Sequence, residues 1–492
     1  MNDIRPILSF ILIIVLYPLS SYSQEESLDY YMHVYLKNGS IVGYNCNDID
    51  SITFSKDLID FWENNNYEII EEEKTHNLTI HEGYISNKTD TIRFVSNDET
   101  KAIILLDNPK IVAQAVTEED WGFFQFPKLY RDFSGNLIVK WQMKEDSHTV
   151  YGVDEYGRVI SYDEGVSWNI ADNNLGHSIE QYKVYLNNGE LLQVKNPASK
   201  DIFSYGSFPL PVNEEAIANI SFYKESELPG ELRGVYLELL DGKSNTVTPI
   251  HAVLDDDGLL RYAIDNLMPI VWWGDIKEEQ DGSLVAGVYG GFYQNAQGQV
   301  LKMGITFYKS EDRGYSWRAI GRIPYVAIEG GGYETFIFDG DSGYSEPTFE
   351  ILEDGTYICI MRNRNWSVPL CVSYSTNKGY NWTYPVPITP NGVKPRLLKL
   401  NKELLVLASG RPGLQLRFSI NNGEKWSEPI EMMPFVDEEG NIKSTRETCG
   451  YADLLKVDDK TFYMVYSDFT TLNQKGERRK SIIFRKITVI QH

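Results

Sequence analysis

Ser310-Glu-Asp312-Arg-Gly314-Tyr-Ser-Trp317 is one of four copies of a short pattern in this chain of 492 residues. The shared pattern is S-x-[D/N]-x-G-x-x-W. Its Asp or Asn can bond nearby backbone amides, its Gly accepts a positive φ, and its Trp buries a large apolar surface. A turn that recurs along a chain indicates a repeated supersecondary unit, as in a propeller or a solenoid. The other copies are Ser161–Trp168, Ser375–Trp382 and Ser419–Trp426.

Segments of alternating apolar residues with a central turn precede the four copies, and two further segments, Ala452–Ser467 and a possible copy at Tyr182–Val194, have no box after them. Such alternation predicts two antiparallel strands joined by a turn. Six units of this kind predict an all-β, six-bladed β-propeller, which leaves only short sheet edges exposed. Residues 195–265 lack these markers and form either a blade edge or an inserted module. The six segments are Leu129–Trp141, Tyr182–Val194, Asp275–Gly290, Pro347–Arg362, Pro395–Gly410 and Ala452–Ser467.

The four copies resemble the Asp-box (BNR) repeats of the sialidase superfamily, and the resemblance covers about residues 111–492. It implies a six-bladed propeller in which the boxes lie on turns away from the catalytic face and have a structural role. Because a fold does not determine a function, the activity has to be inferred from other residues.

The N-terminal segment has the pattern of a secretory signal. Arg5 precedes an apolar run over 7–16, and small and turn residues follow up to Ser23. This order predicts a signal peptide over residues 1–23, and therefore a secreted or periplasmic protein. The run is too short for a confident membrane span, and no nearby Cys could take a lipid, although a retained anchor is an alternative. Residues 24–110 are predicted to form a small β-rich accessory region.

Composition excludes several classes of partner and cofactor. The formal net charge of -24 argues against nucleic acid and anionic membranes as partners. The four cysteines and seven histidines show no metal-ligand spacing, so we predict no metal and no other cofactor. Cys359 and Cys371 fall on successive predicted strands, where they form either a disulfide or two buried thiols.

Charged residues interrupt the strand pattern at corresponding places in three neighbouring units. Glu346 precedes one strand, and Arg362 ends the next. Arg411 follows the equivalent strand of the following unit, and Tyr451 opens the unit after that. A propeller brings corresponding positions together around its axis, so we expect these four side chains to meet.

The four positions also match the site pattern of sialidases. The resemblance implies that Arg362 and Arg411 bind a sugar carboxylate, while Tyr451 attacks the anomeric carbon and Glu346 takes the phenol proton. Arginine offers carboxylates a bidentate fork. A phenol avoids the charge repulsion that a carboxylate nucleophile would meet at a carbon already bearing a carboxylate.

Two further positions complete the expected site. The first carboxylate-binding arginine of the family lies in a Phe/Tyr-Arg-Ile-Pro motif, where this chain has Phe-Gln125-Phe-Pro. Gln125 is therefore the expected substrate contact there, with a neutral hydrogen bond in place of a stronger charge-assisted one. The catalytic acid/base is expected in the loop after Trp141, where Asp146 is the first candidate and Glu145 the second.

The resemblance implies a secreted glycoside hydrolase that removes a terminal sialic acid or related acidic sugar from glycans. The departure at Gln125 leaves two alternatives. One is a glycosidase or lyase of different sugar specificity, and the other is a glycan-binding propeller without activity. Trp272, Trp273 and Trp366 are candidates for stacking on sugars, with core packing as the alternative for Trp272 and Trp273.

Overall fold

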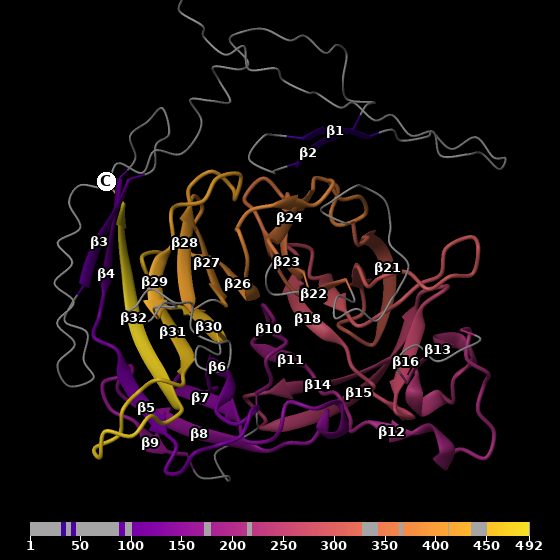
Figure 1. Cartoon of the computed structure of the whole chain (residues 1–492), viewed down its shortest axis with the longest axis horizontal. Helices are drawn as coiled ribbons and strands as arrows, with labels where there is room; N and C mark the ends of the chain where they lie inside the picture. The colour runs from indigo at the N-terminus through magenta and orange to yellow at the C-terminus, as the bar shows by residue number, and fades with distance from the viewer. Residues whose placement is uncertain are drawn as a thin grey trace, which may run out of the picture.

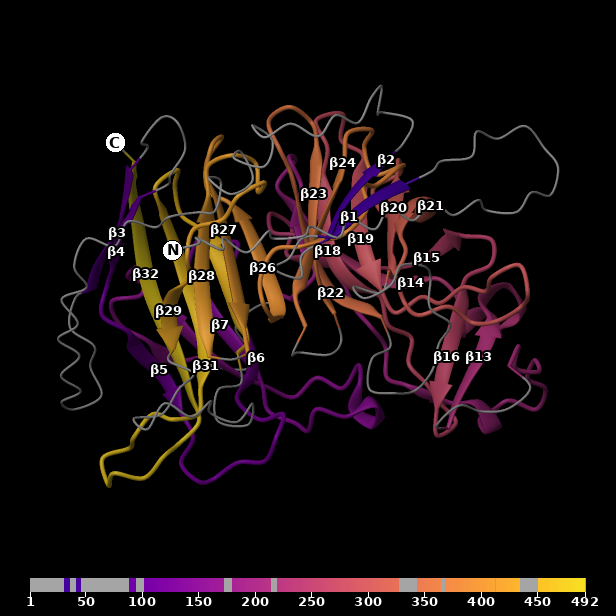
Figure 2. The same cartoon turned by 45° about the horizontal axis from the view of Figure 1, so that its top comes forward.

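The computed structural model describes residues 31–35, 41–45, 88–93, 101–171, 179–213, 219–326, 343–363, 368–411, 413–433 and 450–491. The predicted signal segment lies outside these residues. The described part is all-β (Figures 1 and 2), and no helix in it is long and apolar enough to cross a membrane. Its helical content is four 3₁₀ turns, at His148–Val150, Ile202–Ser204, Glu225–Glu227 and Gly230–Leu232.

Four groups of strands repeat one order, in which each strand pairs antiparallel with the next along the chain. The first group is β6 (Gln125–Arg131), β7 (Leu137–Gln142), β8 (Tyr156–Ser161) and β9 (Asn169–Ile170). The second is β18 (Trp273–Glu278), β19 (Leu284–Tyr289), β20 (Ile305–Ser310) and β21 (Ser316–Ile323). The third is β22 (Tyr344–Ile351), β23 (Tyr357–Asn363), β24 (Leu370–Ser375) and β25 (Val386–Pro387). The fourth is β26 (Val393–Lys399), β27 (Leu405–Gly410), β28 (Leu414–Ser419) and β29 (Ile430–Met433).

Two further groups use strands from distant parts of the chain. In one, β10 (Lys183–Tyr185), β11 (Glu190–Val194), β14 (Val235–Asp241) and β15 (Thr246–Asp255) form an antiparallel sheet, and β15 also pairs parallel with β21. In the other, β30 (Ala452–Lys456), β31 (Thr461–Asp468) and β32 (Ser481–Gln491) are extended by β4 (Lys101–Leu106) and β3 (Lys88–Arg93), while β5 (Lys110–Gln114) pairs with β32. The predicted boundary after residue 110 therefore falls within one sheet.

Residues 195–265 contribute to both structures that the sequence left open. Strands β14 and β15 complete a sheet of the repeated type, whereas the others form a separate inserted sheet (lower right in Figure 1). Its order is β12 (Lys200–Asp201), β17 (Leu267–Met268), β16 (Leu260–Ile264) and β13 (Ile220–Lys224). The remaining pair is β1 (Tyr31–Tyr35) with β2 (Ile41–Asn45).

The first strands of the six repeated groups, β6, β10, β18, β22, β26 and β30, lie nearest a common centre in Figure 1. A charged network joins them there. Arg396 contacts Asp275 at 3.0 Å and Asp453 at 3.1 Å. Asp275 also accepts a hydrogen bond from Thr348, and Asp453 accepts one from the Leu129 amide. Five strands are thus tied at the centre, an arrangement that is consistent with propeller blades.

Each box turn joins the third and fourth strands of its sheet. In the copy after β20, the Ser310 hydroxyl donates to Asp312 and accepts from the Gly314 amide, both at 2.8 Å. Gly314 has a φ of 93°, which glycine adopts without strain. The Trp317 side chain is buried, with its ring centroid 5.0 Å from that of Trp272. Hydrogen bonding and burial therefore account for the residue types that the pattern repeats.

The cysteines at the centre of the third sheet are free. Cys359 lies on β23 opposite Ser373, while Cys371 lies on β24 opposite Met361. Both side chains are buried, and neither is in a disulfide. Of the two alternatives for this pair, the structure has two buried thiols. Cys46 and Cys449 lie outside the described residues.

Candidate active site

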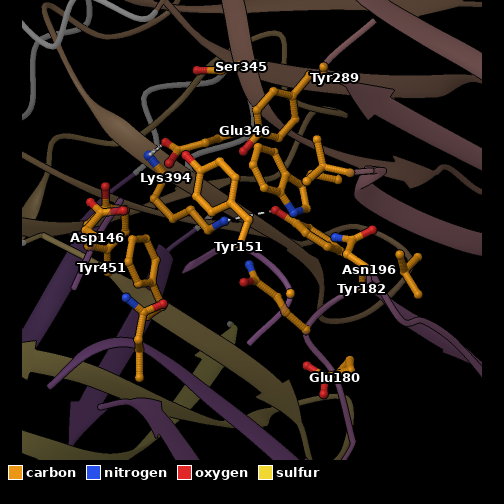
Figure 3. Close-up of a pocket in the computed structure, with 18 of the residues that line it drawn as sticks. Asp146, Tyr151, Glu180, Tyr182, Asn196, Tyr289, Ser345, Glu346, Lys394 and Tyr451 are labelled. Carbon is orange, nitrogen blue, oxygen red and sulfur yellow. Dashed lines mark hydrogen bonds between the residues drawn. The ribbon is translucent and has the colours of Figure 1, made fainter. Parts of the chain in front are cut away.

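A cavity of about 450 Å³ is lined by residues from the inner ends of the six repeated sheets and from the inserted sheet. Five of the six predicted site residues line it: Asp146, Glu346, Arg362, Arg411 and Tyr451. Figure 3 shows Asp146, Glu346 and Tyr451 among the lining side chains. These residues are up to 305 positions apart in sequence. The fold therefore collects the acidic, basic and phenolic groups that the repeat positions had suggested.

Gln125 is the exception. Its side chain has no exposed surface, and it is absent from the cavity lining. The side-chain amide also has no hydrogen-bond partner within the described part of the chain. The neighbouring Phe126 lines the cavity instead. Gln125 was expected to contact the substrate, but in the structure its side chain does not reach the cavity.

A recurring backbone feature directs three side chains into the cavity. Phe126, Glu346 and Lys394 each have a positive φ, of 50°, 48° and 46°, and each sits at a register shift in the first strand of its sheet. Such bulges re-aim a side chain, and they place non-glycine residues in a strained conformation that is typical of functional sites. Each of the three also precedes a proline, a repeated signal that the sequence reasoning did not use. Lys394 was missed for this reason.

Glu346 is a buried carboxylate held by two positive groups. One oxygen lies 2.9 Å from the Arg362 guanidinium and also accepts the backbone amide of Lys394 at 2.9 Å. Burial by itself would raise the pKa of Glu346, but the charges of Arg362 and Lys394 lower this pKa to about 2. Glu346 is therefore ionised at neutral pH, and Arg362 is held in place by it.

Tyr451 is almost fully buried, with 5% of its surface exposed. Its hydroxyl accepts a hydrogen bond from Arg411 at 3.3 Å, and its ring centroid lies 4.5 Å from that of Phe126. Burial, reinforced by the negative charge of Glu346, raises the pKa of Tyr451 well above its usual value, although Arg411 opposes this. The phenol is therefore neutral in the free protein and needs a base before it can act as a nucleophile.

Asp146 comes from the loop after β7, as predicted from the sequence. Its carboxylate accepts a hydrogen bond from the Trp121 indole at 3.2 Å. Burial away from water raises the pKa of Asp146, and the hydrogen bond from Trp121 opposes that effect. Gly122 allows the two loops to approach, because a Cβ there would lie 2.3 Å from the Asp146 amide nitrogen. A carboxyl group with a raised pKa is suited to proton transfer.

Aromatic side chains line the side of the cavity away from Asp146 and Tyr451 (Figure 3). The rings of Tyr151 and Trp273 meet edge to face at 5.0 Å, and Trp273 lies 5.4 Å from Tyr289. The Tyr182 hydroxyl accepts a hydrogen bond from the Lys394 ammonium group at 3.1 Å. Of the tryptophans that the sequence suggested, Trp273 thus lines the cavity. Trp272 packs in the core, and Trp366 lies outside the described residues.

Comparison with known proteins gives a similar fold but no family. No family model matches the chain, and no curated protein is similar to it. A protein of unknown function from Dyadobacter fermentans superposes with a TM-score of 0.50 at 15% identity, over 78% of this chain and 99% of that one.

Three glycosidases are more distant, each at 14% identity. A Hadza microbial sialidase gives a TM-score of 0.43 over 73% of this chain and 64% of that one. A Trypanosoma rangeli sialidase gives 0.42 over 82% and 58%, and a Penicillium chrysogenum α-L-arabinanase gives 0.40 over 73% and 92%. The match covers less than two thirds of either sialidase. These similarities concern the fold alone.

The chemistry of the cavity must therefore be judged from its own residues. Two guanidinium groups lie beside a buried phenol, an ionised carboxylate and a second carboxyl group with a raised pKa. Among the described residues, no group of three or more His, Cys, Asp and Glu side chains could hold a metal ion. The arrangement can bind an anionic group, provide a nucleophile and transfer protons.

Proposed function

We propose that this protein is a glycoside hydrolase on a six-bladed propeller, which removes a terminal sialic acid or related acidic sugar from glycans. The proposal rests on one observation: Asp146, Glu346, Arg362, Arg411 and Tyr451 line the same cavity. The N-terminal signal pattern supports the further proposal that the enzyme acts outside the cytoplasm.

In the proposed reaction, Arg362 and Arg411 bind the carboxylate of the sugar. The Tyr451 oxygen forms a bond with the anomeric carbon as the glycosidic C–O bond breaks. Glu346 accepts the phenol proton, and Asp146 donates a proton to the departing oxygen. Water then attacks the anomeric carbon, giving a proton to Asp146, while Tyr451 leaves and recovers its proton from Glu346.

Because Glu346 is paired with Arg362, its strength as a base would depend on whether a substrate is bound. In the free protein, Arg362 keeps the pKa of Glu346 low, so this carboxylate is a weak base. A substrate carboxylate that binds Arg362 shares its charge and adds a second negative charge nearby. Both effects raise the pKa of Glu346. Glu346 would thus become able to deprotonate Tyr451 once an acidic sugar is bound.

A second candidate is a glycosidase or lyase with a different sugar preference. The specific observation is the apolar Phe126 at the bulge of the first sheet, next to the fully buried Gln125. A site with two rather than three arginines for the carboxylate binds that group less strongly. A panel of released glycans, tested beside a sialoside, separates this candidate from the first. A glycan-binding protein without activity would hydrolyse neither.

The decisive variant is Tyr451→Phe, which removes the proposed nucleophile and keeps the buried ring. We expect hydrolysis of a fluorogenic sialoside to fall by about 10³-fold or more, with substrate binding retained. Tyr463→Phe is the matched control, since that buried phenol bonds to Glu164 outside the cavity. Turnover that survives Tyr451→Phe would exclude the proposed mechanism.

A further inference from the structure

A second positive region lies in the same cavity, away from Tyr451. Three lysines surround one carboxylate there: Glu180 accepts hydrogen bonds from Lys140 at 3.0 Å and from Lys128 and Lys195 at 3.3 Å. We call these four residues the lysine cluster. In Figure 3, Glu180 lies at the lower right, away from Asp146 and Tyr451 at the left, and Tyr151 and Tyr182 are drawn above Glu180. Lys128, Lys195 and Glu180 line the cavity, while Lys140 lies behind them with no exposed surface.

The lysine cluster concentrates several charged groups at one end of the cavity. Lys195 also pairs with Asp154, so three ammonium groups share two carboxylates. Burial, and then the charge of Lys128, lower the pKa of Lys140 to about 7. Taking ammonium groups out of water is unfavourable unless anions compensate for it. Lys140 is therefore only partly charged at neutral pH, and the positive charge that faces the cavity is carried by Lys128 and Lys195.

Lys128 has hydrogen-bonding capacity to spare. Its side chain is buried, and its ammonium group has three N–H donors but bonds to one acceptor, Glu180, within the described part of the chain. The Tyr156 ring lies under it at 4.8 Å and under Lys140 at 3.6 Å, which orients both lysines. A buried donor of this kind, at the wall of a cavity, is preorganised for an anionic acceptor.

The charge of the cavity as a whole contrasts with that of the protein. The chain has a formal net charge of -24, yet basic side chains outnumber acidic ones along the cavity lining. Because most of the surface repels anions, this local excess favours an anionic ligand at a defined place. The lining includes basic residues Lys128, Lys144, Lys195, Arg362, Lys394 and Arg411, and acidic residues Glu145, Asp146, Asp154, Glu180 and Glu346.

We propose that the lysine cluster is a second anion-binding subsite, which takes a carboxylate or sulfate group on the sugar that precedes the terminal acidic sugar. This inference rests on the proposed function, because it assigns the arginine end of the cavity to the terminal sugar. It narrows the substrate class to glycans with anionic groups on two adjacent sugars. The aromatic side chains between the two ends would contact the sugar rings.

Two lysine substitutions test the subsite, with a third as control. Lys195→Gln and Lys128→Met remove one ammonium group each. Lys277→Gln removes a lysine that is equally exposed, 28% against 29% for Lys195, and that also pairs with a glutamate but lies outside the cavity lining. Inorganic sulfate at low millimolar concentration should raise the Tm of the wild type and of Lys277→Gln by more than that of the other two variants, in which only the arginine end still binds the anion. An equal rise in all four proteins, or no rise in any, would overturn the proposal.

A glycan titration distinguishes a sugar substituent from a free anion. Calorimetry on the non-hydrolysing Tyr451→Phe protein would compare a sialyl-galactoside with the same compound sulfated on the galactose. We expect the sulfated compound to bind about tenfold more tightly, which Lys195→Gln should abolish and Lys277→Gln should not. Equal affinities would show that the subsite takes only a free anion and would refute the assignment to a glycan. Because the readout is binding, a lack of hydrolysis by the wild type would refute the proposed function alone.

Discussion

At the scale of single residues, the ion pair between Glu346 and Arg362 is the feature on which most of the site depends. Both groups are largely buried, so each would be costly to bury alone. The pair fixes Arg362 next to the cavity and keeps Glu346 ionised. The ion pair should also stabilise the fold, and this effect can be measured by unfolding, independently of activity.

The depressed pKa of Glu346 predicts a pH-dependent contribution to stability. A carboxyl whose pKa is about 2 when folded, and near 4.5 when unfolded, stabilises the fold above the unfolded value and loses that effect as pH falls toward 2. Glu346→Gln should therefore lower the free energy of unfolding at pH 7 by roughly 3 kcal/mol. The difference from the wild type should shrink between about pH 5 and pH 2.

Denaturant unfolding across that pH range measures this difference. The control is Glu353→Gln, which removes an exposed partner of Lys399 and should change stability little at any pH. A difference between wild type and Glu346→Gln that stays constant with pH would show that the ion pair does not hold the carboxylate ionised.

The hydrogen bond from Trp121 to Asp146 predicts a change in the pH profile of activity. Trp121→Phe keeps an aromatic ring but removes the indole donor, which lowers the pKa of Asp146 in the wild type. The pKa should then rise, and the alkaline limb of the kcat/KM profile should move to higher pH, because Asp146 is the proposed acid of the first step. Trp168→Phe, in a box turn away from the cavity, should leave the profile unchanged. A shift to lower pH in Trp121→Phe would argue against Asp146 as the acid.

The sequence revealed those site residues that carry charge at a place where strands normally carry none. Glu346, Arg362 and Arg411 stood out in this way, and Asp146 followed from the position of its loop. Lys394 and Phe126 did not stand out, because their role comes from a bulge that turns the backbone to positive φ. The burial of Gln125 was equally hidden, since the same bulge changes which side chain reaches the cavity.

At the scale of the elements, local pattern was a reliable guide to hairpins. All six predicted segments contain antiparallel pairs in the structure. Pairings between distant segments could not be predicted in this way. The parallel pairing of β15 with β21, and the separation of the inserted sheet, depend on contacts that no short window of sequence contains.

The box turn after β24 packs directly against the sheet before it, which predicts an unusual sensitivity at Gly321. A Cβ on Gly321 would lie 2.1 Å from the Gly379 carbonyl oxygen of that turn. Gly321→Ala should therefore lower the free energy of unfolding by about 3 kcal/mol, because backbone would have to move. Gly355→Ala is the control: its φ of 84° is strained for alanine, but no atom lies within 4 Å of the new Cβ.

We expect Gly355→Ala to lower stability by only about 1–2 kcal/mol. Urea unfolding of both variants gives the comparison. Equal losses would show that the turn can move away from β21 at little cost, and that the box does not help to join neighbouring sheets.

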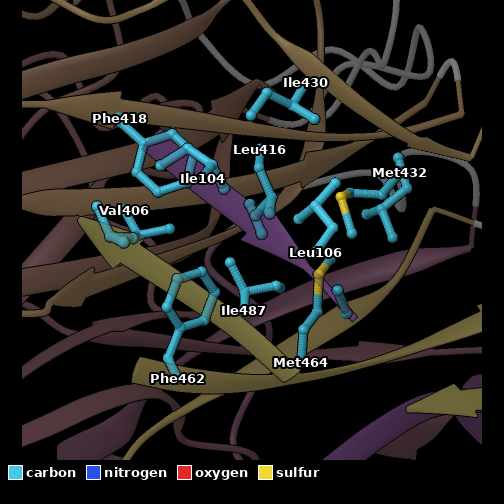
Figure 4. Packing of buried hydrophobic residues seen from close by; sticks show 14 of the residues in the cluster. Ile104, Leu106, Val406, Leu416, Phe418, Ile430, Met432, Phe462, Met464 and Ile487 are labelled. Carbon is cyan, nitrogen blue, oxygen red and sulfur yellow. The ribbon is translucent and has the colours of Figure 1, made fainter. Parts of the chain in front are cut away.

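At the scale of the whole molecule, strands from the N-terminal and C-terminal parts of the chain meet in one sheet. Ile104 of β4 pairs with Val489 of β32, and the Ile104 side chain lies in a buried cluster with Phe418, Phe462 and Ile487 (Figure 4). Strands β4 and β32 thus contribute to the core between two neighbouring sheets. Pairing between strands so distant in sequence limits the movement of this sheet, whose β30 begins directly after Tyr451.

This arrangement explains why residues so far apart in sequence can form one site. Each repeat contributes side chains at its inner end, and the central network of Arg396, Asp275 and Asp453 ties the inner strands together. Five repeats and a possible sixth were readable from the sequence, whereas the pairing of β4 and β5 with β32 was not, because these strands lack the repeated turn.

The central claim is that Tyr451 attacks the anomeric carbon of an acidic sugar, and a trapped adduct tests it most directly. A fluorinated sialosyl fluoride slows the second step, so the glycosyl enzyme accumulates and can be measured by intact mass and peptide mapping. The account predicts one sugar on the peptide that contains Tyr451, and none on the Tyr451→Phe protein. A sugar attached to a different residue, or sialoside hydrolysis with no adduct at all, would contradict it.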